Sequence, residues 1–496
     1  MFRRLLIANR GEIAVRIIRA CREFGIESVA VYSDADSSSP HRALADQAVR
    51  IGPAPAVHSY LSTEAVLRAA KETGAEAIHA GYGFLAENHT FAAACIAGGL
   101  IFVGPPPDVI ASLGSKIAAR HVAARAGIPV VPGETPADQS EAAIADAARR
   151  IGFPVLIKPS AGGGGIGMKA VRDEASLPAA IAQAGREAIA AFGDGTLYVE
   201  RLIDRPRHVE VQVLLDSHGG AVYLFERECS LQRRHQKIVE EAPSTALTPR
   251  LRARMGEAAV ALASAAGYRN AGTVEFLLEG TGEDARFYFL EMNTRLQVEH
   301  PVTEQTTGVD IVLAQLAVAA GEPLPWSQRE LSQRGHAIEV RVYAEDPAQH
   351  DLPQAGPLLL YREPMMPGIR VDSGVVEGGE ISVHYDPLIA KLIAWADTRE
   401  RARRRAVAAL RNYPILGVRT NIAFLIALLE HPRFISGDID TGFVDVERAT
   451  LVASSAGDPP AEAISVAKAA TGIGAIGNSA PTNVPDPWTM LRGWRG

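Results

Sequence analysis

Residues 289–301 have the sequence FLEMNTRLQVEHP, and this stretch decides the fold of the chain. The run before it, residues 272–278, reads GTVEFLL and has a similar mixture of apolar and β-branched residues. Because a polar segment at 280–284 separates the two runs, we predict that they form the arms of one β-hairpin. A turn centred near Glu283 sets three pairs of residues opposite each other: Glu275 and Glu291, Leu277 and Phe289, and Thr273 and Asn293.

The predicted register places two carboxylates, Glu275 and Glu291, face to face inside an otherwise apolar pair of strands. Like charges directly opposite each other destabilise a sheet, so a cation is expected between them. Carboxylate oxygens with open coordination positions suit Mg²⁺ that also carries the phosphates of a nucleotide. The alternative is a solvated pair on an exposed face, because a slip of one residue would turn both side chains to the other side of the sheet.

Four polar residues alternate along the continuation of the second arm: Asn293, Arg295, Gln297 and Glu299. If this continuation is extended, all four side chains point to one side of the chain. The guanidinium of Arg295 offers a planar fork for a carbonate-like anion, and Glu299 is placed to accept a proton from the bound molecule. We therefore predict that this face binds a small oxyanion beside a general base.

The bulk composition indicates a globular chain. Of its 496 residues, 47% are hydrophobic and 22% are charged, which fits about two to four domains without a visible membrane span. The formal net charge of −7 argues against binding to nucleic acid or to an anionic membrane. Asn9 and Arg10 interrupt the apolar run at the N-terminus, which fits a buried strand better than a signal sequence.

The three cysteines are odd in number and far apart: Cys21, Cys95 and Cys229. This spacing argues against disulfides and against a zinc site, and it favours a reducing compartment. We therefore expect a cytoplasmic protein in which Cys229 is a packed small residue and not a nucleophile.

The first part of the chain predicts a βαβ unit, with a strand at 4–8, an amphipathic helix at 11–24 and a strand at 28–32. It lacks the GxGxxG fingerprint, so no dinucleotide site is expected there. Two later glycines, Gly81 and Gly83, favour a tight strand-to-helix turn over a nucleotide-binding loop.

A glycine-rich loop follows the apolar strand that ends at Lys158. Four consecutive glycines at 162–165, together with Gly167, let backbone amides approach phosphates and let the loop move. The loop is not a Walker A motif, because the lysine precedes the glycines and no Gly-Lys-Ser/Thr closes it. We predict a phosphate-covering lid; the alternative is a polyglycine surface linker.

Three further features are ambiguous by themselves. Lys116 lies at the start of a predicted helix, where a lysine is usually a solvated charge. Residues 233–237 concentrate three cations and one histidine, which is either a solvated face or the wall of an anion site. Arg341 shares one face of a predicted strand with Glu339 and Tyr343, and it could equally be a surface residue.

Residues 291–304, EMNTRLQVEHPVTE, resemble the signature of biotin carboxylases, the ATP-grasp component of biotin-dependent carboxylases. The resemblance covers roughly residues 1–446 and is greatest to the N-terminal part of acyl-CoA carboxylase α-subunits. It implies an α/β (α+β) fold with these parts: a Rossmann-like N-terminal domain at 1–113, an ATP-grasp domain at 114–330 with a lid at about 131–201, and a β-rich C-terminal domain at 335–446. Residues 447–496 are predicted to be an Ala/Gly/Pro/Ser-rich linker with a docking tail containing Trp488 and Trp494.

The same resemblance implies four groups of site residues. ATP is expected to contact Lys116, Lys158, Gly163, Gly164, Gly165, Met168, Glu200, Leu202, His208, Gln232 and His235. Mg²⁺ or Mn²⁺ is expected on Glu275, Glu291 and Asn293, and bicarbonate on Lys237, Arg295, Gln297 and the backbone of Val298. The expected catalytic residues are Glu299 as the base, Arg295, Lys237, and Arg341, which would bind biotin and stabilise its enolate. Ile166 stands where many members of the family have a basic residue.

The function implied is ATP- and bicarbonate-dependent carboxylation of protein-linked biotin at N1′ through carboxyphosphate. The chain has no Ala-Met-Lys-Met-like site, so we expect biotin on a separate carrier protein or domain. The resemblance also implies a separate carboxyltransferase and a homodimer or larger assembly. Two alternatives remain. Another ATP-grasp ligase would share the lysines, the lid and the paired glutamates, and a non-catalytic scaffold would have lost at least one of the key charged residues. The final carboxyl acceptor is left open.

Overall fold

The computed structural model describes residues 1–160, 167–234 and 236–455. The N-terminal part is a parallel five-stranded sheet in the order β3-β2-β1-β4-β5. Its strands are β1 (Arg4–Ile7), β2 (Glu27–Ser33), β3 (Gln47–Gly52), β4 (Ala77–His79) and β5 (Ile101–Phe102). Its helices are α1 (Gly11–Phe24), α2 (Pro40–Leu44), α3 (Thr63–Thr73), α4 (His89–Ala97) and α5 (Pro107–Gly114). The predicted βαβ unit is confirmed.

The turn after β4 has the conformation that its glycines suggested. Gly81 and Gly83 both have positive φ angles, of 64° and 67°, in the left-handed region that glycine adopts at little cost. Tyr82, between them, turns its hydroxyl to the carboxylate of Glu12 on α1. This contact fixes the turn against the N-terminus of that helix.

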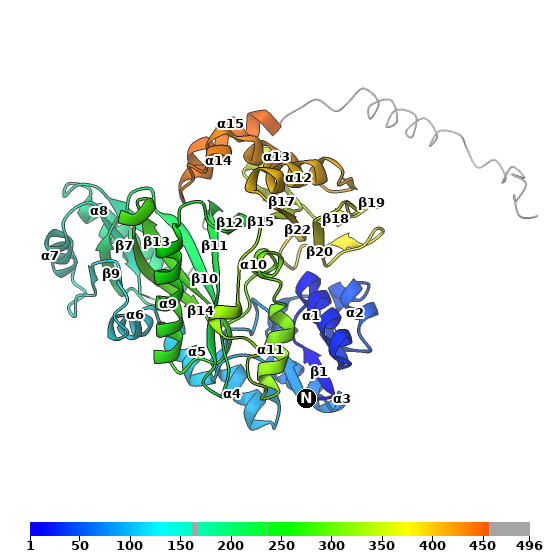
Figure 1. The fold of residues 1–496 in the computed structure, drawn as a ribbon. Helices are drawn as coiled ribbons and strands as arrows, with labels where there is room; N and C mark the ends of the chain where they lie inside the picture. Colours follow the sequence, from blue (N-terminus) through cyan, green and yellow to red (C-terminus); the bar gives the residue numbers. More distant parts are fainter. Residues whose placement is uncertain (161–166, 235, 456–496) are drawn as a thin grey trace, which may run out of the picture.

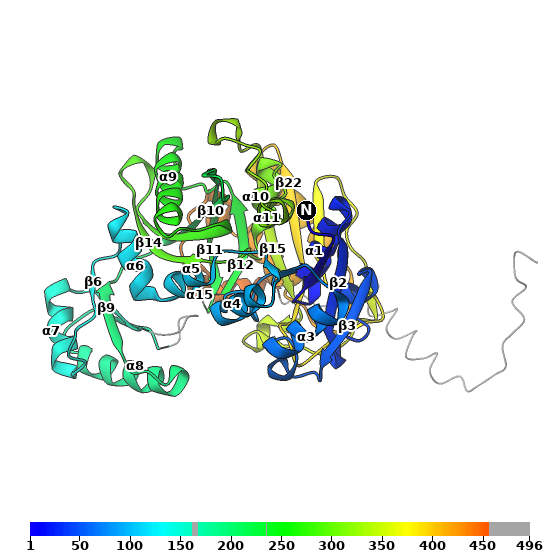
Figure 2. The same ribbon diagram turned by 90° about the horizontal axis from the view of Figure 1, so that it is seen from below.

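The segment predicted as the lid folds around its own small sheet, in the order β6-β9-β7-β8. The strands are β6 (Gly133–Glu134), β7 (Val155–Pro159), β8 (Lys169–Val171) and β9 (Leu197–Arg201), and the helices are α7 (Glu141–Ile151) and α8 (Leu177–Phe192). Both helices pack on this sheet through a separate apolar core. In Figures 1 and 2 these elements project from the molecule on the side away from the blue N-terminal domain.

One antiparallel eight-stranded sheet joins the ATP-grasp and C-terminal parts, in the order β14-β13-β10-β11-β12-β15-β22-β20. Its strands are β10 (Arg207–Leu215), β11 (Ala221–Arg233), β12 (Gln236–Ala242), β13 (Asn270–Glu279), β14 (Arg286–Asn293), β15 (His336–Tyr343), β20 (Ile369–Ser373) and β22 (Leu388–Ala396). Outside the lid, the helices of the ATP-grasp part are α6 (Lys116–Arg125), α9 (Pro249–Ala265), α10 (His300–Thr307) and α11 (Ile311–Ala319). The sheet carries residues from both parts to one place.

The C-terminal part adds four helices over one face of this sheet, as Figure 1 shows at the top. They are α12 (Arg399–Arg411), α13 (Ile422–Glu430), α14 (Pro432–Ser436) and α15 (Phe443–Ser455). Short strands form three further pairs: β16 (Glu345–Asp346) with β17 (Leu352–Pro353), β18 (Gly356–Pro357) with β21 (Glu380–Ile381), and β19 (Leu360–Tyr361) with β23 (Ile415–Leu416). Because α15 continues to Ser455, the first residues of the predicted linker at 447–496 are helical. The two tryptophans of the predicted tail lie outside the described residues.

The predicted hairpin exists as β13 and β14, and its register is confirmed at the end near the signature. Glu275 pairs with Glu291 and Thr273 pairs with Asn293. The predicted pairing of Leu277 with Phe289 is wrong, because a bulge lies between Glu275 and Phe276 and shifts the outer pairs by one residue. Phe276 therefore pairs with Phe289, and both rings are buried in the core.

The predicted extension of the second arm is also wrong. Strand β14 ends at Asn293, and residues 294–299 form an irregular segment, here named the anion loop, before α10 begins at His300. Helix α10 was not predicted, although Pro301 stands near its start, where proline is favoured. The polar residues of the loop are nevertheless brought together, as described next.

Candidate active site

A cavity of about 1040 Å³ lies between the lid, the edge of the large sheet and Arg341 of β15. Its lining includes most of the predicted site residues: Lys116, Lys158, Met168, Glu200, Leu202, His208, Gln232, Lys237, Glu275, Glu291, Asn293, Arg295, Gln297, Val298 and Arg341. Glu299 is fully buried directly behind this lining, within ion-pair distance of two of its members. Gly163, Gly164, Gly165, Ile166 and His235 lie outside the described residues.

Lys237 of β12 is the cation at the centre of one end of this cavity. Its Nζ lies 2.8 Å from Glu275 and 2.7 Å from Glu299, and it also pairs with Glu210 of β10. Burial would lower the pKa of Lys237, but the three carboxylates raise it well above its ordinary value. The lysine is therefore held as an ammonium ion. Sequence reasoning missed Glu210, although its place in an alternating buried strand was a usable signal.

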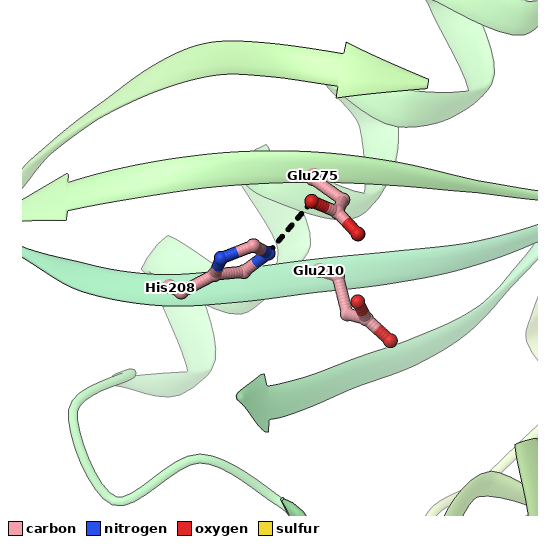
Figure 3. Close-up of side chains that lie close together, drawn as sticks. All are labelled: His208, Glu210 and Glu275. Atoms are coloured by element: carbon pink, nitrogen blue, oxygen red, sulfur yellow. Dashed lines mark ion pairs between the residues drawn. The ribbon is translucent and has the colours of Figure 1, made fainter. Parts of the chain in front are cut away.

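The carboxylates that surround Lys237 also belong to two groups of side chains that could hold a metal ion. Figure 3 shows His208 and Glu210 on one strand and Glu275 on its neighbour, with the imidazole Nε2 of His208 2.9 Å from Glu275. A second group consists of Glu210, Cys229 and Glu299. Because the ammonium of Lys237 is shared by the carboxylates of both groups, the position between them already has a cation.

Glu299 is held between two cations. Its Oε1 pairs with Lys237, and its Oε2 lies 3.0 Å from the guanidinium of Arg341. Burial alone would raise the pKa of Glu299, but Lys237 and then Arg341 hold it well below its usual range. The carboxylate is therefore ionised and oriented by its two partners, which is the state that a proton acceptor needs.

Arg341 has a second carboxylate partner that sequence reasoning missed. Its Nε donates to Oε1 of Glu240 at 2.6 Å. Burial raises the pKa of Glu240 to about 7, although Arg341 opposes this shift. Glu240 lies directly opposite Glu339 in the pairing of β12 with β15, and Glu339 shares a face with Arg341 as predicted. Arg341 is thus a buried residue of the site and not a surface cation.

The anion loop gathers its polar side chains without being a strand. Arg295 donates to Oε1 of Gln297 at 3.1 Å and to Oδ1 of Asn293 at 3.2 Å. Its Nε donates to Glu87 of the N-terminal part at 2.9 Å. The amide of Gln297 reaches Glu275 at 3.3 Å. The polar side chains that were predicted to share one face therefore lie together, and Glu87, which sequence reasoning missed, orients Arg295.

The opposite end of the cavity holds the two lysines expected near phosphates. Lys158, at the end of β7, forms an ion pair with Glu200 of β9. Arg120 of α6 is 3.5 Å from the same carboxylate, a contact that the sequence did not suggest. Burial lowers the pKa of Lys116, with Glu291 opposing this shift. The backbone N–H of Leu202 donates to the Pro154 carbonyl at 2.9 Å, so this N–H already has a partner.

Glu291 differs from the other acidic groups of the cavity. Within the described residues it has no ion pair within 4.0 Å and no side-chain hydrogen bond, whereas Asn293 donates to Glu275 at 2.8 Å. Burial and then the charge of Glu275 raise the pKa of Glu291. A carboxylate that lacks a cation of its own beside an already paired carboxylate fits a site for a divalent cation.

All three cysteines are free and buried. The thiol pKa of Cys229 is raised well above its ordinary value by burial and then by Glu210, which agrees with the prediction of a packed residue. In the part of the chain that the structure describes, no helix has both the length and the apolar character needed to cross a membrane.

Three family models match the sequence. The model of the biotin carboxylase N-terminal domain matches residues 1–110, and that of the ATP-binding domain of the carbamoyl-phosphate synthase L chain matches residues 115–327. The model of the biotin carboxylase C-terminal domain matches residues 339–446.

Two curated relatives are similar over most of this chain. Biotin carboxylase of Halalkalibacterium halodurans is 50% identical over 444 residues, which are 90% of this chain and 97% of that protein. The mitochondrial α-subunit of methylcrotonoyl-CoA carboxylase of Rattus norvegicus is 51% identical over 442 residues, 89% of this chain. The match spans only 61% of that subunit, less than two thirds of its length.

A solved structure is similar in fold as well as in sequence. It is the biotin carboxylase domain dimer of Hydrogenobacter thermophilus 2-oxoglutarate carboxylase, in complex with MgADP, ADP and bicarbonate. The TM-score is 0.86 and the identity 45%, over 91% of this chain and 99% of that one.

Proposed function

The chain belongs to the biotin carboxylase family, and on that premise we propose that its cavity carboxylates protein-linked biotin at N1′, using ATP and bicarbonate. The observation that carries the proposal is Glu299, fully buried between Lys237 and Arg341. The proton acceptor Glu299 would thus lie between Lys237, which can bind bicarbonate, and Arg341, which can stabilise the enolate of biotin.

We propose that a divalent cation, Mg²⁺ or Mn²⁺, is held by Glu275, Glu291 and Asn293. The support is that Glu291 lacks a cationic partner among the described residues, and that all three side chains line the cavity. When bound, such an ion supplies charge neutralisation across the transferring phosphates.

The nucleotide would occupy the other end of the cavity. Lys116 and Lys158 would neutralise its phosphates, and the Leu202 carbonyl would accept from the adenine amino group. His208 and Gln232 line the same wall and are linked to each other at 2.8 Å. Closing this end against water would protect a labile intermediate from hydrolysis.

In the first step, bicarbonate would lie on Arg295, Gln297, Lys237 and the Val298 backbone, and an oxygen of bicarbonate would attack the γ-phosphorus of ATP. The bond from that phosphorus to the ADP oxygen breaks, and the bicarbonate proton passes to Glu299. The products are carboxyphosphate and ADP. Bicarbonate would also compete with Glu299 for the ammonium of Lys237, and this would make the carboxylate more basic when it is needed.

In the second step, carboxyphosphate would break into CO₂ and phosphate, and the phosphate would take the proton from N1′ of biotin. The enolate oxygen that forms would accept from Arg341, whose guanidinium is buried and held by Glu240 and Glu299. The N1′ atom then attacks the carbon of CO₂, giving carboxybiotin. Arg341 would therefore stabilise the enolate oxygen, on which the negative charge develops.

We propose measuring ADP release by the purified chain with Mg²⁺, ATP and bicarbonate, with and without free biotin. Bicarbonate-dependent turnover that biotin stimulates is the expected result. Arg341→Ala should remove the biotin stimulation, and Glu299→Gln should lower turnover by about 10²–10⁴-fold. Turnover that requires another carboxylate or an amine would instead support a different ATP-grasp ligase, and no turnover at all would support a missing partner or a scaffold subunit.

The complete reaction also requires a biotin carrier and a carboxyltransferase. We propose that this chain works with both in an acyl-CoA carboxylase or a related assembly, and that it forms a homodimer. The similarity to a methylcrotonoyl-CoA carboxylase subunit and to a dimeric biotin carboxylase domain supports this. The free cysteines support a reducing compartment such as the cytoplasm.

A further inference from the structure

Lys391 is a fully buried lysine outside the predicted site. It lies on β22, directly opposite Arg341 of β15 on one side and Asp372 of β20 on the other. Residues opposite each other in antiparallel strands share a face, so these three form one polar row, while the alternate residues Val340 and Leu392 pack into the core on the other face. Burying an ammonium ion costs free energy unless it is paired, so its partners indicate its role.

Three segments of the chain meet at this ammonium group. Lys391 Nζ donates to the carbonyl of Val298 at 2.8 Å, and lies 3.1 Å from Glu12 and 3.9 Å from Asp372. Val298 belongs to the anion loop, and Glu12 lies in α1 of the N-terminal part, where it also accepts from Tyr82. The lysine thus ties the anion loop to both flanking parts of the molecule.

The anion loop needs such restraint because it lies beyond the end of β14. Its Gln297 and Glu299 carbonyls accept backbone hydrogen bonds from the start of α10. Side chains add further restraints: Glu87 accepts from the Thr294 N–H at 3.1 Å, and the ring Nδ1 of His300 lies 2.8 Å from the Gln297 carbonyl. The bond from Lys391 fixes the next carbonyl, that of Val298. A planar peptide links this carbonyl to Glu299, so holding it sets the backbone from which the Glu299 side chain projects.

We propose that Lys391 is a positioning residue for bicarbonate. Its ammonium fixes the peptide between Val298 and Glu299, so that the Val298 backbone and the Glu299 carboxylate keep their places relative to Arg295 and Lys237. This inference rests on the proposed function. It does not extend to ATP, because the groups placed near the nucleotide lie on other elements.

The test compares Lys391→Met with wild type in steady-state ADP release, varying bicarbonate and ATP separately. We expect the KM for bicarbonate to rise at least tenfold and the KM for ATP to change less than twofold. Because Glu12 loses its partner in this variant, the double variant Lys391→Met with Glu12→Gln removes that unpaired charge. It should recover thermal stability but keep the high KM for bicarbonate.

Arg399→Met provides a matched control. Arg399 is a cation bound to another buried carboxylate, Glu241, at 2.6 Å, and to the Phe434 carbonyl at 2.8 Å, without contact with the anion loop. The Arg399→Met substitution should destabilise the protein and leave the KM for bicarbonate unchanged.

Three results would overturn the inference while leaving the proposed function intact: an unchanged KM for bicarbonate in Lys391→Met, recovery of both stability and KM in the double variant, or an equal rise of this KM in Arg399→Met. Wild-type turnover without bicarbonate dependence would overturn the proposed function, and this inference with it.

Discussion

The two ends of the cavity differ in how completely their charges are paired. At the bicarbonate end, Lys237 and Arg341 neutralise Glu275, Glu299 and other buried carboxylates within the chain itself. At the nucleotide end, Glu291 has no cationic partner among the described residues, and burial lowers the pKa of Lys116. The first end is paired in advance. At the second, Lys158 is paired with Glu200, but Glu291 depends on a charge that a metal ion would bring.

The physical reason is the cost of burying charge. A buried carboxylate without a cation is destabilising, so a site that must exist before its small anion arrives has to pair its own groups. A site for a highly charged ligand can leave groups unpaired, since the ligand completes it. If this contrast is correct, substitutions at the first end should cost stability, while those of Glu291 and Lys116 at the second should cost activity alone.

The largest effect on stability is expected for Lys237→Met. It removes the ammonium shared by three buried carboxylates, so the free energy of unfolding should fall by about 3–5 kcal/mol. Denaturant unfolding followed by circular dichroism measures this change. Lys116→Met, at the nucleotide end, is the matched control and should change stability by less than about 1 kcal/mol. Equal losses in both variants would remove the contrast between the two ends.

Glu291→Gln should lower turnover without lowering stability. We expect ADP release to fall at least 100-fold, equivalent to about 2.7 kcal/mol in the barrier, because a proposed metal ligand is lost. The free energy of unfolding should stay constant or rise by up to about 1 kcal/mol, since the repulsion by Glu275 is removed. Turnover measured against Mg²⁺ concentration, together with denaturant unfolding, gives both values. A stability loss like that of Lys237→Met would contradict the prediction.

Glu240 makes the bicarbonate end dependent on pH. Burial raises its pKa from 4.5 to about 7, so its contribution to stability is present below pH 4.5 and is lost as the pH rises through 7. Relative to Glu240→Gln, the wild type should therefore lose about 3 kcal/mol of stability between pH 4.5 and 8, since each unit between 4.5 and the raised pKa of about 7 corresponds to about 1.4 kcal/mol. Unfolding of both proteins across this range measures the difference, and a constant difference would mean that Glu240 does not titrate there.

The smallest effect is expected for Cys229→Ala. Cys229 lies within 4.0 Å of Glu299, but its raised thiol pKa and its burial leave it no role as a thiolate. Turnover should stay within twofold of wild type, with a stability loss of about 1 kcal/mol from the small cavity. In native wild-type protein at pH 8, Cys229 should resist alkylation. A large loss of turnover in this variant would mean that the bicarbonate end depends on more than its charges.

The β13–β14 hairpin shows how far sequence reasoning reached. Counting from the polar turn gave the pairing of Glu275 with Glu291, but it could not place the bulge that moves Phe289 opposite Phe276. That bulge accompanies contacts made elsewhere: the Phe289 N–H donates to the Pro129 carbonyl at 2.8 Å. Register inside a strand follows from local alternation, whereas a bulge depends on what packs against the strand.

The anion loop shows the same limit. Alternation grouped Arg295 with Gln297 correctly, although the reason given, an extended strand, was wrong. The side chains meet because Glu87 and Lys391, both distant in sequence, restrain the loop. Neither contact leaves a signal within the signature itself.

The sequence by itself determined the βαβ unit, the strand that carries Lys158, and the chemical types of the residues in the signature. These depend on patterns within a few residues, which hydrophobic periodicity and motif spacing record. Only the tertiary structure decided which cation lies between which carboxylates. Arg341 meets Glu240 because β15 and β12 are neighbours in the sheet, and Lys237 of β12 meets Glu299 of the anion loop, although both pairs are far apart in the chain. A buried charge is stabilised by whatever lies within a few ångströms in space, and no local pattern encodes that distance.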